Sequence, residues 1–114
     1  MLVRNYKETH LGEITMPGSK DVAIRWVISQ KDGASNFSMR VFEVKPGGYT
    51  PHHSHDWEHE VFVKEGEGTL VSDRKEIAFK TGDAIFIPPN ESHQFKNTSQ
   101  KMLEFICLIP NKGK

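Results

Sequence analysis

The chain has 114 residues, fifteen basic and fifteen acidic side chains that cancel, and one cysteine, Cys107. This length suits one domain with one core, so we expect residues 1–114 to form a single domain. The balanced charge, without a long block of one sign, excludes nucleic acid and anionic membranes as expected partners and leaves a small molecule. No apolar stretch is long enough to span a membrane and no signal-peptide pattern is visible, so we expect a cytoplasmic protein, and a lone cysteine agrees with that compartment.

Short runs rich in Val, Ile and Phe alternate with clusters of Gly, Pro, Asn and Asp along most of the chain. Residues 1–20 mix polar and apolar side chains without clear alternation and predict no definite element. Beyond them, the pattern predicts eight strands, at residues 24–29, 37–45, 60–66, 69–72, 76–79, 84–88, 93–97 and 102–110. Segments 31–36, 45–48, 80–83 and 88–92 are the predicted turns. Short strands at this spacing indicate an all-β barrel or jelly roll.

Closely spaced histidines carry the chemistry that the sequence predicts. His53 and His55 are two residues apart, so in an extended segment both rings project to the same face. Residues 56–58 have the length of a hairpin connection, which would place His59 on the next strand, across from His55. Imidazole is the commonest metal ligand among side chains and is neutral near pH 7 without first losing a proton. The pattern therefore predicts a site for a divalent metal ion.

The histidines belong to a longer pattern that resembles the first motif of the cupin family, G-x5-H-x-H-x(3,4)-E-x6-G. The matching residues are Gly47, His53, His55, His59 and Gly66. His59 stands where most cupins have Glu. If Glu60 were that Glu, the final glycine would fall on Glu67. We therefore place His59 in the ligand position and Glu60 on the opposite face of its strand.

A second pattern resembles the family's other motif, G-x5-P-x-G-x2-H-x3-N. It is matched by Gly82, Pro88, Asn90, His93 and Asn97. Asn90 replaces a glycine, and Asn is the residue that next most readily adopts the left-handed turn conformation. We expect Asn97 to close a turn. The two motifs together span residues 47–97.

The resemblance implies a cupin-type jelly-roll β-barrel that holds one divalent ion per chain through His53, His55, His59 and His93. A four-histidine set is most similar to that of small bacterial cupins that carry manganese, so Mn²⁺ is expected first and Fe²⁺ second. Ni²⁺, Cu²⁺ or Zn²⁺ would also bind such nitrogen ligands. The resemblance further implies a homodimer, in which residues 1–20 pair with the neighbouring subunit. Apolar residues on both faces of 37–45 also favour a dimer.

Four residues are candidates for the wall of a substrate pocket. Alternation in 102–110 turns Phe105 and Cys107 inward, because Glu104 prefers solvent. Cys107 is equally well explained as an inert buried thiol. Both faces of 37–45 are apolar, so the orientation of Arg40 stays open; pointing inward, it would clamp a substrate carboxylate. Trp57 would line the mouth or cap the barrel.

Three classes of function remain open. Four neutral imidazoles leave the full double charge on the ion, which favours an anionic small-molecule ligand. The first class is a dioxygenase-type oxidoreductase, the second a non-redox isomerase, lyase or hydrolase with the ion as Lewis acid, and the third a binding module without turnover. The motifs place no Asp or Glu as a general base, which weakens the second class, and the sequence contains no output domain, which weakens the third. We favour the first.

Overall fold

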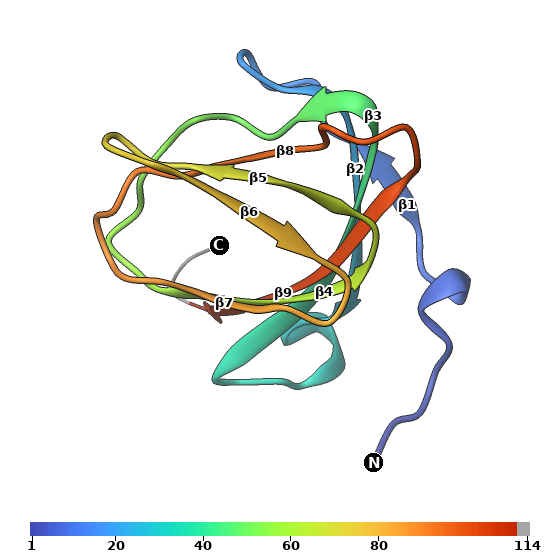
Figure 1. The fold of residues 1–114 in the computed structure, drawn as a ribbon. Coiled ribbons are helices and arrows are strands. Elements are labelled where there is room, and N and C mark those ends of the chain that lie inside the picture. The colour runs from blue at the N-terminus through green and yellow to red at the C-terminus, as the bar shows by residue number, and fades with distance from the viewer. Residues whose placement is uncertain (112–114) are drawn as a thin grey trace.

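The structure, a computed structural model, describes residues 1–111, and these form one curled β-sheet with two short 3-10 turns (Figure 1). The elements, in chain order, are η1 (Tyr6–Glu8), β1 (Leu11–Glu13), β2 (Lys20–Ile28), η2 (Gln30–Asp32), β3 (Phe37–Tyr49), β4 (His59–Glu65), β5 (Glu67–Val71), β6 (Glu76–Lys80), β7 (Ala84–Ile87), β8 (Gln94–Lys96) and β9 (Leu103–Pro110). Within the described residues, no helix is long and apolar enough to cross a membrane.

The strands predicted from the sequence are all present, and the all-β cupin-type fold is confirmed. The predicted turn at 45–48 is wrong, because these residues lie inside the long strand β3. There the register against β2 shifts between Lys20 and Val22, and Gly47 has a φ of 80°. A left-handed glycine and a register shift are the marks of a β-bulge, which bends a strand without ending it. The Pro and Gly residues in 45–48 therefore mark a bend within β3, not a turn between two strands.

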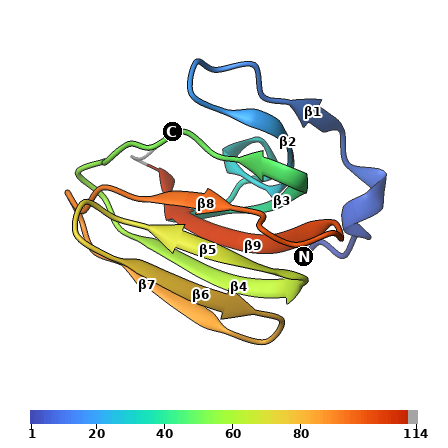
Figure 2. The ribbon, with the colours of Figure 1, turned by 45° about the horizontal axis from the view of Figure 1, so that its top comes forward.

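The sheet order is β6-β5-β8-β3-β9-β4-β7, with β2 on β3 and β1 on β2. Every strand pair is antiparallel, and Figure 2 shows β5, β6 and β8 packed over the layer that contains β4 and β9. β3 joins the two layers because its first part pairs with β9 and its end pairs with β8. His53 and His55 lie in the connection from β3 to β4, His59 begins β4, and His93 lies in the connection from β7 to β8.

The core fills the concave side of this sheet. Phe105 is central: its ring stacks on Phe42 with centroids 4.8 Å apart and on Phe95 with centroids 4.6 Å apart. Along β9 the buried positions are Leu103, Phe105, Cys107 and Ile109, which confirms the inward orientation predicted for Phe105 and Cys107. Burial of each large apolar side chain contributes about 1.5–3 kcal/mol, so this row is a principal source of stability.

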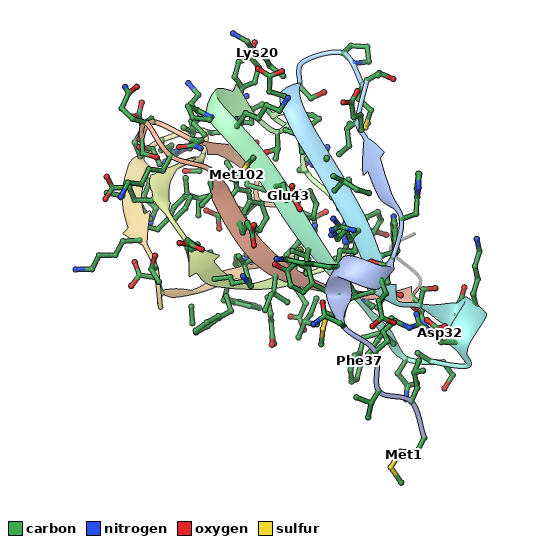
Figure 3. The ribbon with its side chains drawn as sticks, turned by 90° about the vertical axis from the view of Figure 1, so that its right-hand side faces the viewer. Met1, Lys20, Asp32, Phe37, Glu43 and Met102 are labelled. Atoms are coloured by element: carbon green, nitrogen blue, oxygen red, sulfur yellow. The ribbon has the colours of Figure 1, made fainter. Side chains whose placement is uncertain are left out.

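The N-terminal segment lies over the convex side of β2 and β3 (Figure 3). Arg4 donates to the carbonyl of Val27 and forms an ion pair with Asp32 at 2.8 Å. Arg25 donates to the carbonyl of Thr9. β1 pairs with β2 of its own chain. Residues 1–20, which predicted no element, therefore form a cover and an edge strand.

Candidate metal centre

Backbone pairing brings His53 and His93 together. The two residues form an isolated antiparallel bridge, with His53 donating to the carbonyl of His93 at 3.2 Å and His93 donating back at 2.9 Å. Asn90 donates to the carbonyl of His55 at 2.6 Å and has a φ of 71°, the left-handed conformation expected of it. Thus the turn before His93 also fixes the backbone of His55.

The predicted hairpin between His55 and His59 is wrong. His59 begins β4, whose partners are β7 and β9, and it lies opposite Ile87. Residues 53–55 instead pair with the segment that contains His93. His59 reaches the other rings from a neighbouring strand of the barrel, so the four side chains converge through the curl of the sheet.

The four rings lie close together. Imidazole nitrogens of His53, His55 and His93 all lie within 4.8 Å of one another, so these three could hold one metal ion. His59 lies beside this group, with its ring centroid 4.7 Å from that of His93 and 5.4 Å from that of His55. The structure thus brings all four predicted ligands together, and the nitrogen atoms of three of them lie close enough to share one ion. Glu60 is exposed on the opposite face of β4.

Hydrogen bonding leaves nitrogen atoms available at the centre. Nδ1 of His93 is 3.0 Å from the carbonyl of Glu91, which directs its Nε2 inward. Nδ1 of His59 is buried and has no hydrogen-bond partner among the described residues. A buried polar nitrogen without a partner costs about 1–3 kcal/mol. A metal ion or a proton-donating ligand would remove that cost.

Burial keeps the imidazoles neutral. It lowers the pKa of His53 to about 4 and that of His59 to about 3, and the neighbouring histidines and Arg40 lower both pKa values further. Burial also lowers the pKa of His55 and of His93. Only neutral imidazole has a free nitrogen lone pair for a metal ion. At neutral pH the cluster is therefore ready to bind an ion without releasing protons.

The rings line a cavity of about 120 Å³ inside the barrel. The wall consists of Ile14, Met16, Ile24, Arg40, Phe42, Thr50, Pro51, His53, His55, His59, His93, Phe95, Phe105 and Cys107. The pocket candidates Arg40, Phe105 and Cys107 therefore lie on this wall.

Arg40 points inward, which settles the orientation that the sequence left open. Its guanidinium group lies 5.3 Å from the ring of Trp26 and 4.9 Å from that of Phe42, and its Nη2 donates to Sγ of Cys107 at 3.1 Å. Its Nε is buried without a hydrogen-bond partner among the described residues. Arg40 is the only charged residue on the described cavity wall besides the titratable histidines and the Cys107 thiol. The wall thus carries a positive charge with no carboxylate to balance it.

Cys107 is buried, and burial raises the pKa of its thiol, with Arg40 opposing that shift. Trp57 is not on the cavity wall. Its ring stacks on His55, with centroids 4.2 Å apart and planes at 8°, and so orients that imidazole. His52 points outward and lies 3.7 Å from the exposed carboxylate of Asp73.

Part of the cavity wall was not predicted from the sequence. Ile14 and Met16 come from the N-terminal segment, which had no readable alternation. Thr50 accepts a hydrogen bond from the amide of Phe95 at its side-chain oxygen and holds β8 against the end of β3. Only its position three residues before His53 could have indicated in the sequence that Thr50 lies near the site.

The donor set fits a divalent transition metal. Imidazole nitrogens suit Fe²⁺, Ni²⁺, Cu²⁺ and Zn²⁺ and bind Mn²⁺ more weakly, so the four imidazoles alone do not identify the ion that the protein holds. Their uncharged character leaves the double charge of any bound ion in the cavity, next to Arg40. The arrangement is therefore suited to binding an anion.

Known proteins agree with this fold. The family model described as "Cupin domain" matches residues 40–109. The "Oxalate-binding protein" of Thermotoga maritima is 31% identical over 114 residues, which cover 96% of this chain and 93% of that protein. The solved structure of the polyketide cyclase RemF from Streptomyces resistomycificus is 34% identical, with a TM-score of 0.91 over 97% of this chain and 80% of that one. A predicted oxalate decarboxylase from Thermotoga maritima is 27% identical, with a TM-score of 0.85 over 96% and 98% of the two chains. The chain belongs to the cupin family.

Proposed function

We propose that His53, His55, His59 and His93 hold one divalent ion per chain, Mn²⁺ first and Fe²⁺ second. Nitrogen atoms of His53, His55 and His93 lie within 4.8 Å of one another, and His59 has a buried nitrogen that lacks a partner among the described residues. The choice of manganese rests on the resemblance to four-histidine cupins. The choice of histidines rests on their shared cavity.

The ligand of this site is a small organic anion, held between the ion and Arg40. The observation that carries this proposal is the unbalanced charge of the cavity: Arg40 lines it with a buried, unpartnered Nε, and no carboxylate among the described residues faces it. Guanidinium groups bind carboxylates through charge-assisted hydrogen bonds. A cavity of about 120 Å³ favours a compact acid over a long one.

Among reactions, a dioxygenase-type oxidation of such an anion is the function we favour. A bound Mn²⁺ or Fe²⁺ would supply Lewis acidity and one-electron chemistry. The chain's own residues would orient the substrate: Arg40 would hold its anionic group, and Phe95 and Phe105 would exclude water from its carbon skeleton. The described wall offers no Asp or Glu as a general base, which disfavours an isomerase or lyase that works by proton transfer.

A second candidate is ligand binding without turnover. The name of the Thermotoga maritima relative supports it, because that protein is called oxalate-binding and matches nearly the whole chain. The same cavity charge serves this function, since a dicarboxylate can contact an ion and Arg40 together. The two candidates differ only in whether the bound anion reacts.

The test starts from protein purified without added metal. Elemental analysis and electron paramagnetic resonance should find Mn²⁺ or Fe²⁺ at about one ion per chain, as four converging imidazoles require. Oxygen uptake is then measured with a panel of small carboxylates. Uptake that depends on the ion and the anion supports the dioxygenase. Saturable binding without uptake supports the binding module, and zinc or no metal contradicts the oxidative function.

A further inference from the structure

An apolar row of side chains lies beside Arg40 on the cavity wall. Phe42 follows Arg40 by two residues on β3, so both side chains point to the same side of the sheet. The strand register places Phe42 opposite Phe105 on β9 and opposite Ile24 on β2. All four residues line the cavity. An anion that Arg40 holds therefore has this apolar row next to it.

The ligand histidine His59 lies on the other side of Arg40. His59 points into the barrel two residues before Val61 on β4, and Val61 pairs with Cys107, the partner of Arg40. Phe105 precedes Cys107 by two residues on β9, in the opposite direction. The order along the inner side of the sheet is therefore His59, Arg40 and then the apolar row. A ligand that extends from the metal centre past Arg40 meets apolar side chains.

A tight turn in the N-terminal segment borders the far end of this row. The amide of Ser19 donates to the carbonyl of Met16 at 3.1 Å, and the Ser19 hydroxyl donates to the same oxygen at 2.7 Å. Pro17 in the second position and Gly18 in the third, with a φ of 85°, are typical of a type II turn. Ile14, before the turn, donates its amide to a carbonyl of β2 at 2.9 Å. The backbone thus fixes the positions of Met16 and Ile14.

Met16 lies at the boundary between the cavity and the solvent. Its side chain lines the cavity and is 53% exposed, whereas Phe105 on the same wall is 1% exposed. Ile14 and Ile24, which also line this end, are partly buried against the core. Apart from the four histidines, Arg40 is the only side chain on the described wall that is charged at neutral pH. A second charge at the far end of a ligand would lose water there without gaining a partner.

We propose that the anion bound at this centre carries its charge at one end and a short apolar chain at the other, and that Met16 contacts the end of that chain. The carboxylate lies between the ion and Arg40, and the chain runs along Phe42 and Ile24 toward Met16. This inference rests on the proposed function and adds to it the chemical class of the ligand and a residue that selects it. Each methylene group that leaves water for this row increases the affinity by up to about fourfold.

Calorimetric titration of Mn²⁺-loaded protein with oxalate, acetate, pentanoate and glutarate tests the proposal. Oxalate has no chain and measures the anion site alone. Pentanoate should bind at least about tenfold more tightly than acetate, because it adds three methylene groups. Glutarate has the same number of carbons as pentanoate but a second carboxylate at its far end. It should bind at least about tenfold more weakly than pentanoate, because that carboxylate would face the apolar wall.

Substitution of Met16 tests its role. Met16→Ser should weaken pentanoate binding by about fivefold and leave the affinity for oxalate within about twofold, because only pentanoate reaches the far end of the row. Met102→Ser is the matched control: Met102 is also a partly exposed methionine, at 38%, but does not line the cavity. It should leave both affinities unchanged. Circular dichroism checks that each variant is folded.

The affinity for oxalate separates a failure of this inference from a failure of the proposed function. If oxalate binds, but glutarate binds as tightly as pentanoate or Met16→Ser leaves pentanoate binding unchanged, the inference is wrong and the anion site stands. If none of the acids binds to the metal-loaded protein, the proposed function is wrong as well, and the inference falls with it.

Discussion

Arg40→Gln should remove most of the affinity for small anions while leaving the fold intact. A hydrogen bond to a charged group contributes about 1.5–3 kcal/mol, so the loss should be roughly ten- to hundredfold in affinity. Stability of the ligand-free protein should change little. Two cation–π contacts, with Trp26 and Phe42, are lost at about 0.5–1 kcal/mol each, together with the weak hydrogen bond to Sγ of Cys107. Removal of the buried, unpartnered Nε of Arg40 raises the free energy of unfolding by about 1–3 kcal/mol.

The assay is calorimetric titration of metal-loaded protein with oxalate, together with urea unfolding of the ligand-free protein. Arg74→Gln is the matched control, since Arg74 is exposed and lies outside the cavity wall. It should bind oxalate as the wild type does. If Arg40→Gln binds oxalate as tightly as the wild type, the charge of the cavity does not select its ligand. If it unfolds far more easily, Arg40 has a structural role instead.

Three further predictions concern the metal centre and its frame. His59→Ala should lose metal faster than the wild type on dialysis against a mild chelator, whereas His59→Glu should retain the metal but bind anions more weakly. If His59→Ala retains metal as well as the wild type, His59 is not a ligand. Asn97→Ala should lower the free energy of unfolding by about 2–4 kcal/mol in urea titrations without changing metal content. The Asn97 side chain is 1% exposed, donates to the carbonyls of Val44 and Lys101 and accepts from the amide of Ser99. An unchanged urea midpoint would contradict this prediction. In the metal-free protein, the free energy of unfolding should be steady above pH 6.5 and fall toward pH 4. In this range the unfolded chain takes up protons at His53 and His59, whereas their pKa values in the folded state are about 4 and about 3. Urea midpoints that do not move between pH 6.5 and pH 4 would refute the assignment of neutral, buried rings.

The strands and the family could be predicted because both depend on local patterns. Alternation in 102–110 correctly placed Phe105 and Cys107 on the concave side, since only one side of β9 faces the core. The spacing of the two histidine motifs indicated the cupin fold before any contact was known. Asn90 was correctly expected in the left-handed conformation, because few other residues adopt it readily.

The pairing of the histidine segments could not be predicted, because it depends on the sheet order. Short spacing between His55 and His59 suggested a hairpin, but β4 obtains its partners from β7 and β9. The bend at Gly47 was taken for a turn, since a bulge and a turn use the same residues. Both errors concern which strand lies next to which, and strand alternation carries no such information.

The orientation of Arg40 was open for a related reason. The outward face of β3 looks like a core face in the sequence because Val41, which alternates with the cavity-facing Arg40 and Phe42, is also buried, at 4% exposure. Residues 1–20 themselves show no alternation, so the contribution of Ile14 and Met16 to the cavity could not be predicted.

The four-histidine metal centre can be tested by a crystal structure of the protein purified without added metal, with anomalous diffraction measured at the absorption edges of manganese and iron. We predict one anomalous peak per chain, in contact with imidazole nitrogens of His53, His55, His59 and His93. A peak bound through Glu60 in place of His59, or no peak between these histidines in protein that contains metal, would contradict it.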